Sequence, residues 1–120
     1  MRCIIFVVND KLGTPTYTID FAKNTELLIR KEAWGLYNLV CRGVTSRLEV
    51  AKKILYYLNL EKNIKLTEVN SDYFKKDYFS FRPNSERLIN KKLNEKSLDI
   101  MRDWEICLKE YLEEYYSNYV

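Results

Sequence analysis

Four runs of residues have the apolar pattern of β-strands. Residues 3–8, CIIFVV, form a continuous apolar and β-branched run, which predicts a strand buried on both faces. Residues 34–41, WGLYNLVC, are rich in aromatic and branched side chains and predict a second strand, while residues 64–69, IKLTEV, alternate as a half-buried strand does. Residues 86–90, ERLIN, are expected to form a short edge strand.

Four other runs have the period of an amphipathic helix or the residues that begin one. Residues 18–30 predict the first helix. Ser46 and Glu49 have the spacing of a capping box and predict the start of the second. Residues 91–96 predict a short helix, and residues 103–116 predict the last one. The side chains expected on inner helix faces are Phe21, Ala22, Thr25, Leu28, Ile29, Leu48, Ala51, Leu55, Leu58, Trp104, Cys107, Leu108, Tyr111 and Tyr115.

The order of these elements predicts the class of fold. Residues 70–84 have no clean period, and we expect an ordered loop that packs its aromatic rings. Strands and helices otherwise alternate, which predicts an α/β fold with a small mixed sheet, packed helices and some parallel pairing. With 120 residues and no linker, one domain over residues 1–120 is expected. The rings of the loop are Tyr73, Phe74, Tyr78, Phe79 and Phe81.

Charge and hydropathy disfavour two kinds of partner. The net charge is +3, and the basic residues are interleaved with acids instead of forming one stripe, so no nucleic acid is expected. Glu105 and Lys109 have the spacing of an ion pair on the outer face of the last helix. No apolar run approaches the ~18 residues of a membrane span, and no signal-peptide cleavage site follows the first run. We therefore expect no membrane partner and a cytoplasmic location.

Cysteine, histidine and glycine usage excludes several kinds of site. Cys3, Cys41 and Cys107 lie in separate apolar runs and are expected to be small core residues, with no disulfide framework and no metal site. The chain has no histidine, which excludes imidazole catalysis and imidazole metal ligation. Its three glycines are isolated and no Y-x-x-x-K spacing occurs, so we expect no catalytic residue and no cofactor bound by this chain alone.

Two segments could hold a polar ligand. In the turn after the first strand, Gly13 permits a bend, Pro15 fixes φ, and Thr14 and Thr16 offer hydroxyl groups beside the amides of a helix start. The alternative is that Thr16 or Thr18 only caps this helix. The second segment contains Arg82, whose guanidinium matches the geometry of a phosphate, and the alternative there is a surface salt bridge.

Four ordered segments resemble one family of enzymes. They are VVNDKLGTPTYTIDFA, GLYNLVCRGVTSRLEVAKKIL, FRPNSERLINKKL and MRDWEICLKEYL, and together they extend over nearly the whole chain. In order and spacing they resemble the C-terminal half of dTDP-4-dehydrorhamnose reductases, which belong to the extended short-chain dehydrogenase/reductase superfamily. The resemblance implies a substrate-binding region that normally follows a Rossmann domain, with the catalytic tyrosine and lysine in that absent domain.

The resemblance also implies a set of binding residues. Asn9, Asp10, Gly13, Pro15 and Thr16 match the family's loop beside the sugar-nucleotide cleft. Two neighbours in this loop depart from the family pattern. Lys11 stands where glutamine is usual, and Thr14 stands where serine or alanine is usual. Outside the loop, Arg82 and Pro83 match an Arg-Pro pair whose arginine commonly approaches the diphosphate.

The implied partners and cofactor belong to the parent enzyme. The ligand expected is a nucleoside diphosphate sugar, with a dTDP-sugar the first candidate, in the biosynthesis of cell-surface polysaccharide. The absent Rossmann domain is a second expected partner, and NADP or NAD is the cofactor expected for the full-length enzyme. A homo-oligomer is also considered. The alternative is a stand-alone module that binds nucleotide sugars or a protein partner without catalysis.

Overall fold

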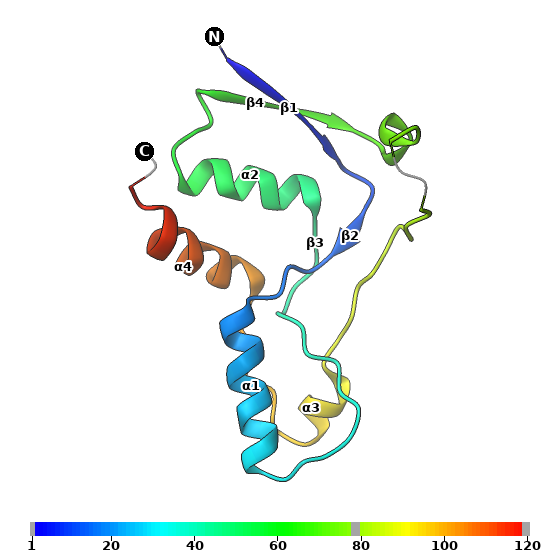
Figure 1. Ribbon diagram of the computed structural model, residues 1–120, viewed down its shortest axis with the longest axis vertical. Coiled ribbons are helices and arrows are strands. Elements are labelled where there is room, and N and C mark those ends of the chain that lie inside the picture. Colours follow the sequence, from blue (N-terminus) through cyan, green and yellow to red (C-terminus); the bar gives the residue numbers. More distant parts are fainter. Residues whose placement is uncertain (1, 78–79, 119–120) are drawn as a thin grey trace.

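The computed structural model describes residues 2–77 and 80–118 and consists of short strands, four α-helices and one 3-10 helix (Figure 1). Helix α2 lies beneath one pair of strands, α4 lies beside α2, and α1 and α3 form the opposite end of the molecule. The elements are β1 (Cys3–Val8), β2 (Leu12–Gly13), α1 (Thr18–Arg30), β3 (Thr45–Ser46), α2 (Arg47–Tyr57), β4 (Ile64–Val69), η1 (Ser71–Phe74), α3 (Lys91–Glu95) and α4 (Trp104–Tyr116).

The strands form two separate two-stranded sheets. β1 pairs with β4 in parallel, from Cys3 opposite Ile64 to Val8 opposite Val69, and β2 pairs with β3 in the antiparallel sense. The predicted α/β fold with parallel pairing is therefore confirmed. The strand at residues 64–69 has the predicted bounds.

Other strand predictions are wrong. β1 is a strand but is not fully buried: Ile4 and Phe6 remain 55% and 43% exposed. Its sheet has two strands, and β4 is its neighbour on one edge. Residues 34–41 and 86–90 form no strand. The physical reason is visible at Val40, whose amide and carbonyl both bond to the side chain of Asn90 instead of to a neighbouring strand.

The bounds of the helices agree with the prediction better than their buried faces do. α1 has the predicted bounds, but its buried residues are Asp20, Asn24 and Leu28, while Phe21 and Ile29 are exposed. The predicted helix start is confirmed, since the Ser46 hydroxyl accepts a hydrogen bond from the Glu49 amide at 3.2 Å, while the Glu49 carboxylate pairs with Lys52. The predicted stripe of α4 is buried only in its first turns: Tyr111 and Tyr115 are exposed.

A buried apolar cluster lies between the start of α4 and the segment that precedes β3. It contains Cys41, Met101, Trp104 and Cys107, all buried. Cys3 is exposed on β1, so the prediction that all three cysteines are core residues is wrong for this one. The difference follows from the open face of the β1–β4 sheet.

The loop after β4 packs some of its rings. The ring of Tyr73, in η1, stacks on the ring of Phe6 with a centroid distance of 5.1 Å, and it also contacts Phe74. Phe81 is 91% exposed, and the contact of its ring is with the Lys11 ammonium, 5.9 Å from the ring centroid. The remaining two rings of the prediction, Tyr78 and Phe79, lie outside the described residues.

The molecule is flat, with extents of 55 × 37 × 19 Å. Its radius of gyration is 17.0 Å, compared with about 14 Å for a compact domain of this length. The excess arises because the two ends of the molecule, one built on the β1–β4 sheet and one on α1, are joined through a narrow middle (Figure 1). None of the described helices combines the length and apolar character of a membrane span.

Candidate functional site

The short strand β2 is held on both of its edges by segments that are distant in the sequence. Leu12 pairs with Ser46 of β3 on one edge and forms a bridge to Ser85 on the other. The Leu12 amide donates to the Asn84 carbonyl at 2.9 Å, and the Leu12 carbonyl accepts from the Glu86 amide at 3.0 Å. The turn after β1 is therefore fixed between the start of α2 and residues 84–86.

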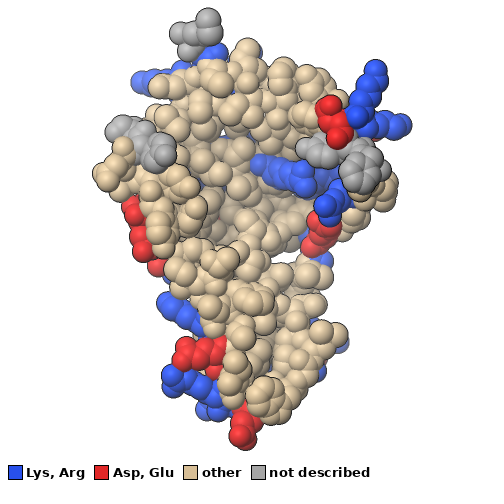
Figure 2. Space-filling model, viewed as in Figure 1, with Lys and Arg blue, Asp and Glu red and all other residues tan. Residues whose placement is uncertain are grey.

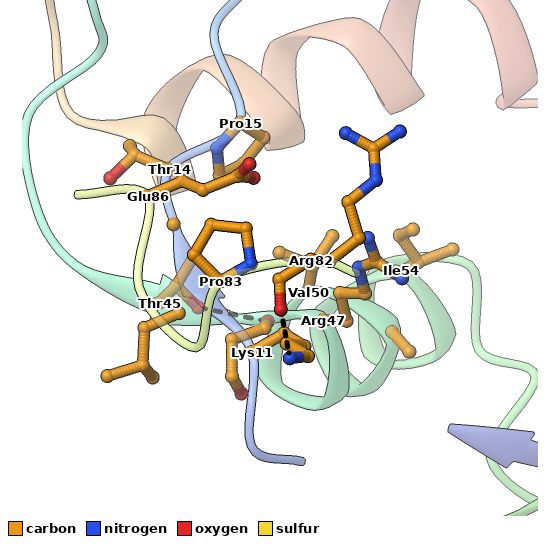
Figure 3. A pocket seen from close by; sticks show the side chains of 14 residues that line it. Lys11, Thr14, Pro15, Thr45, Arg47, Val50, Ile54, Arg82, Pro83 and Glu86 are labelled. Atoms are coloured by element: carbon orange, nitrogen blue, oxygen red, sulfur yellow. Dashed lines mark hydrogen bonds between the residues drawn. The ribbon is translucent and has the colours of Figure 1, made fainter. Parts of the chain in front are cut away.

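A pocket of about 370 Å³ lies where these three segments meet (Figure 3). Its floor is apolar and is provided mainly by α2, while its charged residues come from all three segments. Figure 2 shows basic side chains bordering a hollow in the upper part of the molecule. The residues that line the pocket are Lys11, Leu12, Gly13, Thr14, Pro15, Thr45, Ser46, Arg47, Val50, Ala51, Ile54, Arg82, Pro83 and Glu86.

Five of the eight residues predicted to bind substrate line this pocket: Lys11, Gly13, Thr14, Pro15 and Arg82. The first four come from one continuous segment, whereas Arg82 is contributed by a segment that lies about 70 positions further along the chain. The turn and the Arg-Pro pair, separate in the sequence, thus face one cavity.

The remaining three predicted residues lie elsewhere and make internal contacts. The Asn9 side-chain amide donates to the Glu68 carboxylate at 2.7 Å. The Asp10 carboxylate accepts hydrogen bonds from the amide and hydroxyl of Ser71, and these bonds lower the pKa of Asp10. Both contacts fasten the end of β1 to the end of β4. Thr16 lines a different cavity, of about 350 Å³, beside α4.

The threonines of the turn do not cap α1. The N-cap residue is Tyr17, with no hydrogen bond from its side chain to the helix. The Thr14 hydroxyl instead donates to the Gly43 carbonyl at 2.6 Å, and the Thr16 hydroxyl accepts from the Cys41 amide at 3.3 Å. The two hydroxyl groups thus connect the turn to the segment before β3. Gly13 lies in β2 without a positive φ, so the bend does not depend on its conformational freedom.

Sequence reasoning missed Arg47, which lines the pocket from the first position of α2. The side chains of Arg47 and Arg82 are exposed, and neither makes a hydrogen bond or ion pair with another part of residues 2–77 and 80–118. The salt bridge considered for Arg82 is therefore not formed among these residues. The spacing of Ser46 and Glu49 indicates where this helix begins, but nothing in the sequence indicates that Arg47 lies near Arg82.

A group of titratable residues lies apart from the pocket, between α2 and α4. The Tyr57 hydroxyl donates to the Glu105 carboxylate at 3.1 Å, and the Lys53 ammonium lies 2.6 Å from the same oxygen. Burial and the hydrogen bond to Glu105 raise the pKa of Tyr57, which keeps the phenol protonated. The predicted pair of Glu105 with Lys109 is wrong, because Glu105 contacts Lys53 across the helix interface and Lys109 pairs with Glu113.

A second group, formed by Asp20, Cys41 and Cys107, is buried near the start of α1. Their ligand-type atoms lie within 4.8 Å of one another. The Cys107 thiol donates to the Asp20 carboxylate at 3.3 Å, and burial together with this hydrogen bond raises the pKa of Cys107 to about 12. Since a metal-binding cysteine must lose its proton, the cluster has the chemistry of an internal hydrogen-bond network. The carboxylate is already paired with Arg102.

The fold and the cationic pocket define an α/β ligand-binding domain. Residues 2–117 match the family model of the RmlD substrate binding domain, and the chain belongs to this family. The resemblance seen in the sequence is thereby confirmed.

Known proteins similar to the chain share both sequence and fold. The spore coat polysaccharide biosynthesis protein SpsK of Bacillus subtilis (strain 168) is 32% identical over 108 residues, which are 90% of this chain and 36% of that protein. A dTDP-4-dehydrorhamnose reductase from Clostridium acetobutylicum ATCC 824 is 28% identical with a TM-score of 0.84, over 94% of this chain and 39% of that chain. The reductase from Bacillus anthracis str. Ames, in complex with NADP, is 29% identical with a TM-score of 0.83, over 95% and 38%. The chain thus spans little more than a third of the length of these relatives.

Proposed function

We propose that this chain is the substrate-binding portion of an NAD(P)H-dependent reductase of the dTDP-4-dehydrorhamnose reductase type. The observation that carries the proposal is the meeting of the β1–α1 turn with Arg82 around one pocket. In this role the pocket binds a nucleoside diphosphate sugar, a dTDP-sugar in the first instance. The proposed process is the synthesis of surface polysaccharide, in line with the name of the SpsK relative.

In this proposal the chain binds the nucleotide sugar, and by itself it does not catalyse the reduction. The cofactor proposed for the complete enzyme is NADP or NAD, and its reduced form, NADPH or NADH, would donate the hydride. The Bacillus anthracis neighbour, solved in complex with NADP, supports NADP. In this division of labour the residues of the pocket hold and orient the nucleotide sugar, and the proton-transfer groups belong to the Rossmann portion. One domain over residues 1–120, the cytoplasmic location and a homo-oligomer stay predictions.

The proposal is tested by an amide NMR titration of the chain with dTDP. We expect shifts concentrated in residues 9–18 and around Arg82. An Arg82→Ala variant is expected to bind dTDP more weakly by about 1.5 kcal/mol, because a charge-assisted contact to phosphate is lost. Arg30→Ala serves as the matched control, since Arg30 is exposed and pairs with Glu26 at the far end of α1. Shifts confined to other surfaces, with unchanged affinity of the Arg82 variant, would contradict the proposal.

A further inference from the structure

Two arginines approach the pocket from opposite edges of the same strand. Arg47 follows Ser46, which pairs with Leu12 on one edge of β2, and Arg82 precedes the residues that pair with Leu12 on the other edge. Two segments that flank one strand lie roughly 10 Å apart. Both side chains line the pocket, so a ligand lying over β2 is within reach of both guanidinium groups (Figure 3).

The position of Arg47 is fixed by its helix. The Ser46 side chain caps α2, and Leu48, the next residue after Arg47, is buried. The backbone on each side of Arg47 is therefore held, while its own side chain is exposed and has no partner within the described part of the chain. The guanidinium of Arg47 thus has all its donors available to an anionic ligand, and its point of attachment is fixed.

Lys11 has a different role, although it also lines the pocket. Its ammonium donates to the Arg82 carbonyl at 2.8 Å (Figure 3). It also donates to the Asn84 side-chain oxygen at 3.0 Å. Two of its three donors are thereby used inside the protein. Lys11 thus fastens the backbone that carries Arg82 and keeps one donor, whereas all the side-chain donors of the two arginines are unused within the described residues.

The floor of the pocket complements this charge. Val50, Ala51 and Ile54 of α2 line the same pocket as the arginines and give it apolar surface. Among the lining residues the acid is Glu86, so the three cations Lys11, Arg47 and Arg82 leave the pocket positive. A ligand that combines two adjacent phosphates with an apolar ring face fits such a site.

We propose that Arg47 is a second diphosphate-binding residue, acting with Arg82 across β2, and that Lys11 is a positioning residue for the segment of Arg82. This inference rests on the proposed function and deepens it. Arg47, which the sequence did not identify, would contact the phosphates directly. Lys11, which the sequence did identify, would not contact the ligand and would only position the segment of Arg82.

The experiment measures dissociation constants of the full chain for dTDP and for inorganic pyrophosphate by calorimetry or NMR. Arg47→Gln is expected to raise the dissociation constants of both ligands about five- to tenfold and by the same factor. The reason is that the lost contact is to the phosphate groups that both ligands contain. Arg82→Gln is expected to act alike. Arg30→Gln, which removes the same charge far from the pocket, is expected to change neither constant.

A further variant separates binding from positioning. Lys11→Met is expected to shift the free-state amide signals of residues 82–86, because the bonds that hold this segment are lost, whereas Arg47→Gln leaves those signals in place. If wild-type chain binds dTDP but Arg47→Gln binds it equally well, the inference is overturned and the proposed function stands. A loss confined to dTDP, with pyrophosphate unaffected, places Arg47 at the nucleoside and also overturns the inference. If neither ligand binds to the wild-type chain, both proposals fail.

Discussion

Asp20 and Arg102 lie 82 positions apart in the sequence and form a bidentate pair. The Nε and Nη2 atoms of Arg102 donate to both oxygens of the Asp20 carboxylate, with a shortest distance of 2.7 Å, and the Arg102 amide donates to the same group. The Asp20 side chain is 3% exposed. This pair connects the start of α1, directly after the turn of the site, to the segment that leads into α4.

Removing the charge of Asp20 is expected to destabilise the fold. Asp20→Asn should lower the free energy of unfolding by about 2 kcal/mol, because the buried carboxylate loses its charge-assisted hydrogen bonds with the half-exposed Arg102. Urea unfolding measures this change. Glu26→Gln is the matched control, since it breaks an exposed pair with Arg30 and should cost less than about 0.5 kcal/mol. Equal losses in the free energy of unfolding for the two variants would show that the pair of Asp20 with Arg102 stabilises the fold no more than the exposed pair does.

The same pair makes stability dependent on pH. Hydrogen bonds from Arg102 hold the pKa of Asp20 below its ordinary value of 3.8. A carboxyl group whose pKa is lower in the folded state contributes stability above its unfolded pKa, and this contribution is lost as the pH falls through the folded pKa. The urea midpoint should therefore be constant from pH 7 to 5 with respect to this group and fall below about pH 4. The decline should be shallower in Asp20→Asn, and parallel curves would contradict the assignment.

Two glycines provide a matched test of backbone strain. Gly43 has φ +93°, and an added Cβ would lie 2.9 Å from Cδ1 of Trp104. Gly43→Ala should therefore lower stability by about 2 kcal/mol. An added Cβ at Gly13 meets no atom within 4 Å, and no positive φ is involved, so Gly13→Ala should leave the melting temperature unchanged or slightly raised. Thermal unfolding of the two variants decides, and a larger loss for Gly13→Ala would contradict the described backbone.

The three cysteines should differ in reactivity. Cys3 is exposed, whereas Cys41 and Cys107 are buried with their sulfur atoms 3.8 Å apart. Because the pKa of Cys107 is raised to about 12, its thiol remains protonated at neutral pH and is a poor nucleophile. Alkylation of the native chain at pH 7.5 should label Cys3 first, and labelling in urea should reach all three. Mass spectrometry measures the sites, and early labelling of Cys107 would refute the expectation.

Local signals in the sequence predicted local structure well. The bounds of α1, the N-cap of α2 at Ser46 and the strand at residues 64–69 depend on neighbours within a few positions, and each is present. Residues 34–41 have a strand-like composition, but side chains distant in the sequence bond to their backbone: Asn90 to Val40 and Thr16 to Cys41. No periodicity in the segment itself encodes such a contact.

The inner face of α1 illustrates a second limit. An apolar stripe was predicted, yet the buried face includes Asp20 and Asn24. Asn24 donates to the Leu98 carbonyl and accepts from the Ile100 amide, so its burial is stabilised by backbone groups more than 70 positions away. From the sequence alone a polar residue is expected to be exposed, because the distant hydrogen-bond partners that allow its burial are not visible there. The site shows the same division: the turn was predicted from its own residues, and Arg47 was not.

The pairing of β1 with β4 also bears on the order of folding. Every residue of β1 faces a residue 61 positions later, so this sheet can form only after a long stretch of chain has been brought back on itself. Closing so long a loop is slow compared with forming a helix, and α1 and α2 both lie within it. The helix that bears Arg47 is therefore expected to be structured early, and the turn anchored by β1 to become fixed late. We therefore expect the ligand pocket to be completed late in folding, after the helices have formed.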